Sequence, residues 1–199
     1  MVTDEARPAS PDPAAIIEAL RPLYGTPGWR PHGDATSELV LTLLSQNTSD
    51  VNSKRAFERL IRTFGSLEAT ANAGAEEIAA AIWLGGLARV KAPRIKEVVT
   101  AILGERGSLD LGFLRETPIP EAKAWLRRLP GVGPKTAACV LLFSLRLPVL
   151  PVDTHVHRVA RRLGLIGHKT SAEEAHKMLE AARPPDQVYS FHMNMVRHG

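Results

Sequence analysis

The feature that most constrains the fold is the spacing of the apolar residues, which is helical along almost the whole chain. Apolar side chains recur three and four positions apart in one segment after another, and this spacing places them on a single face of a helix. No stretch shows the sustained alternation of apolar and polar residues that is typical of a half-buried strand. Proline and glycine, 15 of each, fall mostly between these segments or at their first turn. The sequence therefore predicts an all-α protein.

Two segments differ from the amphipathic ones because they are apolar nearly all round. They comprise residues 39–44 and residues 137–143, and a helix without a polar face is expected in the interior of a protein. We therefore predict that both form central core helices. Among the amphipathic segments, the one that carries residues 57–64 follows Asp50, whose carboxylate is the predicted N-cap.

The composition narrows the classes of protein. The chain has 199 residues, 44% of them apolar, which suffices for a hydrophobic core, and no apolar run reaches the roughly 18–20 residues that span a bilayer. The first residues lack the basic and apolar pattern of a secretory signal, so we expect a soluble, intracellular protein. The single cysteine, Cys139, excludes an intramolecular disulfide and any metal site built from several thiolates of this chain.

Charge is distributed unevenly along the chain. Residues 1–50 carry 3 Lys or Arg and 7 Asp or Glu, whereas residues 51–199 carry 22 and 14. A basic body of this kind suits an anionic partner such as nucleic acid. The alternative is that the charge serves solubility alone.

The most informative connection reads LPGVGPKTA at residues 129–137. We predict a helix, a turn with Gly131 and Gly133, and a second helix that begins with Pro134, since proline is favoured at the first helical position. Glycine lets the backbone approach a ligand closely, and successive N–H groups beside a helix N-terminus bind anions. A phosphodiester fits such a site, although an ordinary helix–helix turn is the alternative.

Lys135 falls in the first turn of that second helix, where the helix dipole disfavours a cation. Partial burial beside the positive helix end would raise the fraction of free amine, the form that a Schiff-base lysine requires. The alternative is a solvated lysine whose stem covers the turn.

A second polar cluster lies at the start of another amphipathic helix. Asp153 precedes this helix and is predicted as its N-cap, a position that also fixes a carboxylate in a geometry suited to function. His155 and His157 are two positions apart and so lie on different faces of the helix, which argues against a metal pair. We expect these histidines to serve polar packing or contacts with DNA, and we expect no metal site.

Three motifs together carry a resemblance to a known family. They read LLSQNTSD at residues 43–50, LPGVGPKTA at residues 129–137 and VDTHVHR at residues 152–158. With these motifs the chain resembles, from about residue 14 to its end, the helix-hairpin-helix DNA glycosylases, and most closely endonuclease III. The resemblance implies two helical lobes with a DNA-binding cleft between them. We expect a mobile tail over residues 1–12, one discontinuous lobe from residues 13–34 and 148–199, and a helical-bundle lobe from residues 35–147, which ends in the helix-hairpin-helix.

The resemblance also implies roles for individual residues. Lys135 would be the nucleophile and Asp153 its essential carboxylate partner, while the backbone of the hairpin would hold DNA phosphates. Asn47 would fill the gap left by an extruded nucleotide, and Leu87 would be an apolar wedge beside the lesion. The residues expected at the DNA are Gln46, Asn47, Leu87, Gly131, Val132, Gly133, Thr136 and His155.

The function implied by the resemblance is base excision DNA repair by a bifunctional enzyme. Through a Schiff base of Lys135, one enzyme would act as a DNA glycosylase and as an abasic-site lyase that works by β-elimination. Its partner would be double-stranded DNA that contains damaged bases, oxidised pyrimidines foremost, or abasic sites. We expect a monomer in the cytoplasm, associated with the nucleoid through DNA and not with a membrane. Two alternatives remain open: a monofunctional glycosylase for another base, and a non-catalytic helix-hairpin-helix module that only binds DNA.

The chain departs from the pattern of this family at two places. The hairpin often carries Arg where this chain has Pro134, which removes one basic contact and stiffens the turn. Family members commonly continue past a pair like His198-Gly199 into a loop whose four cysteines bind an iron–sulfur cluster. We therefore expect no cofactor in this chain, and a 4Fe-4S cluster only if a natural cysteine-rich tail is missing from this sequence.

Overall fold

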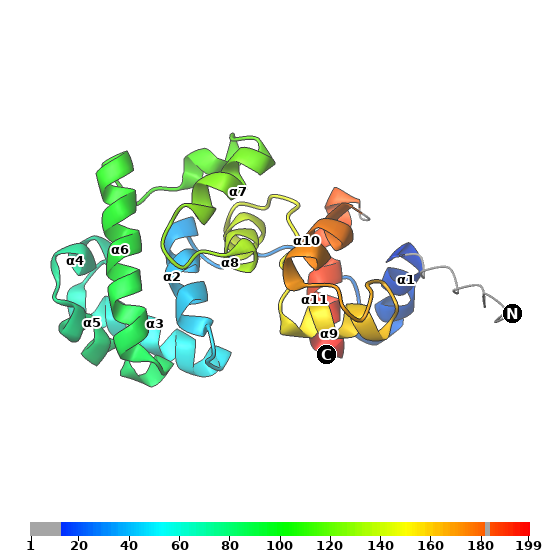
Figure 1. Cartoon of the computed structure of the whole chain (residues 1–199), viewed down its shortest axis with the longest axis horizontal. Helices are drawn as coiled ribbons and strands as arrows, with labels where there is room; N and C mark the ends of the chain where they lie inside the picture. Colours follow the sequence, from blue (N-terminus) through cyan, green and yellow to red (C-terminus); the bar gives the residue numbers. More distant parts are fainter. Residues whose placement is uncertain (1–12, 182–183) are drawn as a thin grey trace, which may run out of the picture. The chain divides into compact units, whose positions relative to one another are not determined.

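Regular structure in the described residues is entirely helical (Figure 1). The computed structural model describes residues 13–181 and 184–199, and for this part of the chain the predicted all-α fold class is confirmed. The tail expected over residues 1–12 lies outside the described residues. Between residues 13 and 199, apart from the gap at 182–183, every helix is too short or too polar to traverse a bilayer.

The chain divides into two units. The central unit is the segment Arg30–Pro151, and the terminal unit combines the segment that ends at Trp29 with the segment Val152–Gly199. The boundaries expected from the sequence lie after residue 34 and before residue 148.

The first boundary differs from the expected one because His32 attaches its neighbours to the central unit. The His32 N–H donates to the carbonyl of Phe143 at 3.3 Å, and the two rings stack with their centroids 4.5 Å apart. This attachment joins segments that lie far apart in the sequence, so the spacing of apolar residues around His32 does not report it.

The central unit is built from seven α-helices and three short helical segments among residues 30–151. The α-helices are α2 (Ala35–Ser45), α3 (Asp50–Phe64), α4 (Leu67–Asn72), α5 (Ala75–Ala81), α6 (Ala88–Arg106), α7 (Ile119–Arg127) and α8 (Pro134–Cys139). The short segments are the 3-10 helices η1 (Trp83–Gly85) and η2 (Gly112–Arg115), and the π-helical η3 (Val140–Ser144), which continues α8.

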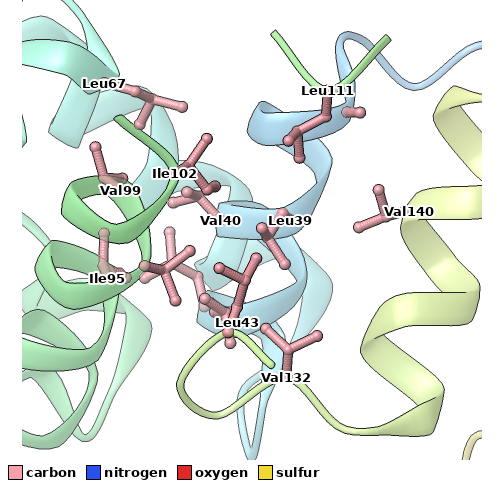
Figure 2. Close-up of a cluster of buried hydrophobic side chains, with 14 of the residues drawn as sticks. Leu39, Val40, Leu43, Leu67, Ile95, Val99, Ile102, Leu111, Val132 and Val140 are labelled. Atoms are coloured by element: carbon pink, nitrogen blue, oxygen red, sulfur yellow. The ribbon is translucent and has the colours of Figure 1, made fainter. Parts of the chain in front are cut away.

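Helix α2 supplies the middle of the hydrophobic core of this unit. Figure 2 shows its residues Leu39, Val40 and Leu43 between side chains of α6 on one side and Val132 and Val140 on the other. Leu39 and Leu43 are at most 1% exposed, and burying a leucine fully contributes about 1.5–3 kcal/mol to folding. Both segments that were predicted as core helices are buried in this unit, the second as α8 followed by η3.

The beginning of α3 corrects one prediction. Asp50 is the first residue of the helix, and the N-cap is Ser49, whose Oγ accepts a hydrogen bond from the Asn52 N–H at 3.4 Å. Ser49 has the extended backbone of a cap residue, with φ −68° and ψ 151°. Serine and aspartate are both good caps, so the side chains alone do not distinguish the two positions; the backbone turn at Ser49 does.

The terminal unit contains the remaining α-helices of the described residues. These are α1 (Pro13–Tyr24), α9 (Thr154–Arg162), α10 (Ala172–Ala181) and α11 (Val188–His198), with the 3-10 helix η4 (Pro185–Gln187) before α11. Helix α11 packs against both α1 and α9. The Asn194 side-chain amide donates to the carbonyl of Gly25 at 3.0 Å, so α11 holds the N-terminal segment in this unit.

Candidate active site

The turn between α7 and α8 has the backbone geometry of the predicted hairpin. Pro134 is the first residue of α8, and Gly133 is its N-cap with an extended backbone. Gly131 has φ +73°, a left-handed conformation that glycine adopts without strain. Helix α7, this turn and α8 together form a helix-hairpin-helix (Figure 1).

Four backbone N–H groups of this hairpin find no acceptor among the residues that the structure describes. They belong to Gly131, Gly133, Lys135 and Thr136. The first helical hydrogen bond of α8 joins the Ala137 N–H to the Gly133 carbonyl at 3.0 Å, so the amides before it have no helical acceptor. Closely spaced N–H groups of this kind form a concave surface that favours an anion.

Two residues predicted to contact DNA, Val132 and Thr136, are buried in the protein alone. The Val132 N–H donates to the carbonyl of Leu129 at 3.1 Å, and its side chain is 6% exposed at the edge of the core (Figure 2). The amide of Val132 therefore closes the turn in the protein alone, and its contact with a DNA phosphate stays a prediction. Thr136 is 4% exposed, so its side chain packs inward and only its backbone N–H remains at the hairpin.

Lys135 lies in the first turn of α8 and is half-buried. Its ammonium group forms no ion pair or hydrogen bond with any residue in the described ranges. No carboxylate among the described residues holds this amine in place, so the side chain is available to attack an electrophile.

Asp153 belongs to the terminal unit, whereas Lys135 belongs to the central unit. Asp153 is the N-cap of α9, as predicted, and its Oδ1 accepts a hydrogen bond from the Val156 N–H at 2.7 Å. The residue before it, Val152, is 3% exposed and anchors the chain at this point. The carboxylate is half-buried and fixed in orientation, which suits either a structural cap or an electrostatic role.

The two histidines that follow Asp153 have different surroundings. His157 Nε2 lies 2.9 Å from the carbonyl oxygen of Thr170, so this ring serves polar packing inside the terminal unit. His155 is exposed, and its Nδ1 lies 3.1 Å from a guanidinium nitrogen of Arg158. Arg158 in turn donates to the carbonyl of Gly199. Of the pair, only His155 stays at the surface.

The loop between α2 and α3 is tied to the hairpin. The Gln46 side-chain amide donates to the carbonyl of Gly131 at 3.5 Å, and its Oε1 accepts from the Arg94 guanidinium at 3.3 Å. Asn47 follows in an exposed, left-handed conformation with φ +54°, which asparagine adopts more readily than most residues. The structure thus brings the Gln46 loop and the glycine hairpin together within the central unit.

Leu87 lies at the N-terminus of α6 with an unfavourable backbone conformation and an exposed apolar side chain. Its backbone is left-handed, with φ +49°, and its side chain is 55% exposed. It occupies the N-cap position but makes no side-chain cap. An apolar residue that is both strained and solvated contributes little to folding, and such strain concentrates at functional sites.

Sequence reasoning missed two basic residues of α6 that contact these loops. Arg94 lies across the hairpin so closely that a Cβ on Gly131 would be 2.1 Å from its Cδ. Lys91 is 3% exposed, and its Nζ donates to Leu44, Thr48 and Gly85. Lys91 and Arg94 are three positions apart, a spacing that is also typical of the solvent-exposed face of a helix. The sequence therefore does not distinguish them from the other lysines and arginines of α6.

The cysteine content bears on the cofactor that the resemblance raised. Cys139, the one cysteine of the chain, is 4% exposed in α8. An iron–sulfur cluster of the four-cysteine kind needs four thiolates, so the residues of this sequence do not fit that group.

Comparison with known proteins connects this arrangement to DNA repair. Residues 40–185 match the model of the family described as HhH-GPD superfamily base excision DNA repair protein. A candidate DNA glycosylase of Arabidopsis thaliana is 39% identical over 161 residues, which make up 81% of this chain and 55% of that protein. Endonuclease III of Thermotoga maritima is 34% identical over 161 residues, or 81% of this chain and 71% of that enzyme.

The fold of the chain is also similar to that of a solved endonuclease III structure. The structure of a trapped endonuclease III–DNA covalent intermediate, in an estranged-adenine complex, matches with a TM-score of 0.78 and 26% sequence identity. The match covers 94% of this chain and 84% of that one. A match of this extent includes residues of both units.

Proposed function

The chain belongs to the HhH-GPD superfamily of base excision DNA repair proteins, and from this premise we propose that it is a bifunctional DNA glycosylase and abasic-site lyase. The observation that carries the proposal is the state of Lys135. Its amine has no partner in the described residues and stands in a hairpin whose amides are free to bind an anion. A module that only binds DNA needs the amides but not a half-buried lysine.

The first step is access to the damaged nucleotide. A base inside a duplex is out of reach, so the nucleotide must leave the stack. Leu87 would enter the duplex beside the lesion as an apolar wedge, which costs unstacking energy and stabilises a kinked helix. Asn47 would fill the space that the base leaves. Both side chains are exposed, and both backbones have positive φ.

The hairpin would hold the DNA backbone during this step. The free N–H groups of Gly131, Gly133, Lys135 and Thr136 would donate to the oxygens of one phosphate or of two adjacent ones. The guanidinium of Arg94, which lies over Gly131, would add a positive charge at the same point. Arg94 would thus supply a basic group at a hairpin that carries Pro134 in place of an arginine.

Cleavage of the glycosidic bond would then follow from Asp153 and Lys135. As the bond between C1′ and the base nitrogen breaks, the base leaves with the bonding pair and positive charge develops on the sugar, which the Asp153 carboxylate stabilises. The free amine of Lys135 attacks C1′, and opening of the sugar ring at its oxygen gives a protonated imine.

The same imine would support the lyase reaction. Its positive charge acidifies the C2′ hydrogens, so loss of one C2′ proton expels the 3′ phosphate by β-elimination. Water then hydrolyses the imine and restores the lysine. One residue thereby serves both activities. We propose oxidised pyrimidines as the class of damaged base, on the similarity to endonuclease III.

Borohydride trapping tests this proposal. With duplex DNA that carries an oxidised pyrimidine, reduction of the imine should give a stable protein–DNA adduct, and Lys135→Ala should abolish it. Lys169→Ala, which changes an exposed lysine of the terminal unit, is the matched control and should leave the adduct unchanged. Base release without any adduct would identify a monofunctional glycosylase, and DNA binding without base release or strand cleavage would identify a binding module.

A further inference from the structure

Lys91 is the most deeply buried charged side chain of the central unit that the proposed reaction does not use. It is 3% exposed, and burial lowers the pKa of its ammonium group below the ordinary value of 10.5. Its Nζ donates three hydrogen bonds: to the Leu44 carbonyl at 2.6 Å, to Thr48 Oγ1 at 2.7 Å and to the Gly85 carbonyl at 2.7 Å. All three acceptors are neutral oxygens, so geometry rather than ion pairing decides this arrangement.

The acceptors belong to three different elements. Leu44 lies in the last turn of α2, where carbonyl groups lack a helical donor and carry partial negative charge. Gly85 ends η1, and Thr48 lies in the loop between α2 and α3. The Thr48 hydroxyl also donates to the Gly85 carbonyl, so the loop and the turn are joined directly as well as through the ammonium group.

The two segments that Lys91 joins carry the side chains that would enter the duplex. Asn47 immediately precedes Thr48, and Leu87 follows Gly85 by two residues. The packing at Gly85 leaves little freedom, because a Cβ there would lie 3.1 Å from the Cβ of Ala56. The position of each inserting residue is therefore set within two residues of a hydrogen bond to the same ammonium group.

We propose that Lys91 is a positioning residue for extrusion of the damaged base. It fixes the loop that carries Asn47, between α2 and α3, at a set distance from the turn that carries Leu87, between η1 and α6, so that both side chains enter the duplex together. This inference rests on the proposed function for its catalytic consequence. Its structural content, the coupling of the two segments, is independent of activity. A lysine suits this role better than an apolar residue of similar size, because only a group with three donors bonds three oxygens at once.

The first test measures the coupling in the absence of DNA. Lys91→Met keeps an unbranched side chain, shorter by the one nitrogen atom, and removes all three donors, whereas Thr48→Val removes only the hydroxyl. Lys96→Met is the matched control, because Lys96 lies on the same helix and donates to the carbonyl of Ala73 at 2.7 Å. Hydrogen exchange followed by mass spectrometry should show faster exchange in residues 45–50 and in residues 83–88 together for Lys91→Met and Thr48→Val, and in neither segment for Lys96→Met.

A response confined to one segment, or none, would overturn the proposal. Circular dichroism and thermal unfolding would show whether each variant is folded. If Lys91→Met does not fold, Lys91→Gln carries the test, because it removes the ammonium group and keeps a polar side chain at the same place; it should speed exchange in both segments.

The second test asks whether Lys91 acts through the inserting residues. In single-turnover excision from duplex DNA, Lys91→Met should slow base release about 10- to 100-fold, as expected for a small misplacement. Imine trapping on a single-stranded abasic oligonucleotide, which needs no extrusion, should change less than about twofold. In an Asn47→Ala, Leu87→Ala background, Lys91→Met should have almost no further effect on excision, since residues that act through one another are not additive.

Full additivity in that background would assign Lys91 a general structural role and refute its role in extrusion. A parent protein that neither releases a base nor forms an adduct would instead refute the proposed function, and the exchange measurement would still decide whether Lys91 couples the two segments.

Discussion

Gly131 must be glycine for two physical reasons, its left-handed backbone and the close approach of Arg94. The backbone has φ +73°, and a Cβ would lie 2.1 Å from Cδ and 2.4 Å from Nε of Arg94. Gly133, two residues further on, has φ −89° and no heavy atom within 4 Å of an added Cβ. The two glycines of the hairpin therefore have different reasons to be glycine, although they look equivalent in the sequence.

The difference gives a prediction with an internal control. Gly131→Ala should lower the free energy of unfolding by about 1–2 kcal/mol or more, because left-handed backbone is unfavourable for alanine and Arg94 must move. Gly133→Ala should change it by less than about 0.5 kcal/mol, as for other substitutions without strain. Denaturant unfolding measures both values, and equal destabilisation by the two substitutions would contradict the argument.

Arg94 should contribute to DNA binding through charge alone. If its guanidinium neutralises one phosphate, Arg94→Gln should weaken binding to damaged and undamaged duplexes alike and reduce the slope of log K against log salt by about 1. Arg106→Gln is the control, because Arg106 lies at the other end of α6 over the Phe113 ring, 4.0 Å from its centroid. Titrations at several salt concentrations measure the slope; an unchanged slope for Arg94→Gln would rule out a phosphate contact.

At the scale of elements, the end of α2 is completed by a side chain from another helix. Leu44 is in the last turn of α2, and Lys91 of α6 donates to its carbonyl. Helix C-termini are more often completed by a local glycine turn. A cap that comes from 47 residues further along the chain makes the end of α2, the following loop and the start of α6 depend on one another.

This cap has a consequence for the pH dependence of stability. Burial lowers the pKa of Lys91 in the folded protein, whereas the unfolded chain retains about the ordinary value of 10.5. Between these two values the unfolded state binds more protons than the folded state, so the contribution of Lys91 to the free energy of unfolding rises with pH. The difference in free energy of unfolding between the parent protein and Lys91→Met should therefore shift in favour of the parent as pH rises toward 10.5. Chemical denaturation at a series of pH values measures it, and a difference that is constant or falls would refute the lowered pKa.

At the scale of the whole molecule, the residues proposed for the chemistry come from both units. Lys135 stands in the central unit and Asp153 in the terminal unit, which is itself assembled from both ends of the described chain. The matched family model, over residues 40–185, includes both positions. Asp153 also caps α9. A test of its role in the reaction therefore needs a substitution that removes the charge and keeps the cap.

Asp153→Asn achieves this separation. Asparagine caps helices about as well as aspartate, so thermal stability should change little, whereas the negative charge that would stabilise the developing cation is lost. Base excision should fall by about 100-fold or more, as when an electrostatic group is removed. Imine trapping on a preformed abasic site should fall much less, because no glycosidic bond remains to be broken. Equal losses in the two assays would point to disruption of the site as a whole.

The sequence by itself determined the class of fold and the hairpin. Periodic apolar residues specify helices because a helix must bury one face. The two glycines that precede Pro134, together with this proline, specify a turn that local backbone preferences favour. The same local signals located Lys135 and the cap at Asp153. These features depend on residues a few positions apart, so a single sequence contains the information.

Only the tertiary structure decided which groups of the hairpin remain available and what holds the neighbouring loops. Val132 closes the turn and Thr136 packs inward, and neither follows from the motif alone. Arg94 contacts a glycine 37 residues away, and Lys91 bonds to a carbonyl 47 residues away. Burial and hydrogen bonding over such separations depend on how helices pack. The residues next to Lys91 and Arg94 in the sequence therefore do not indicate which groups these side chains contact.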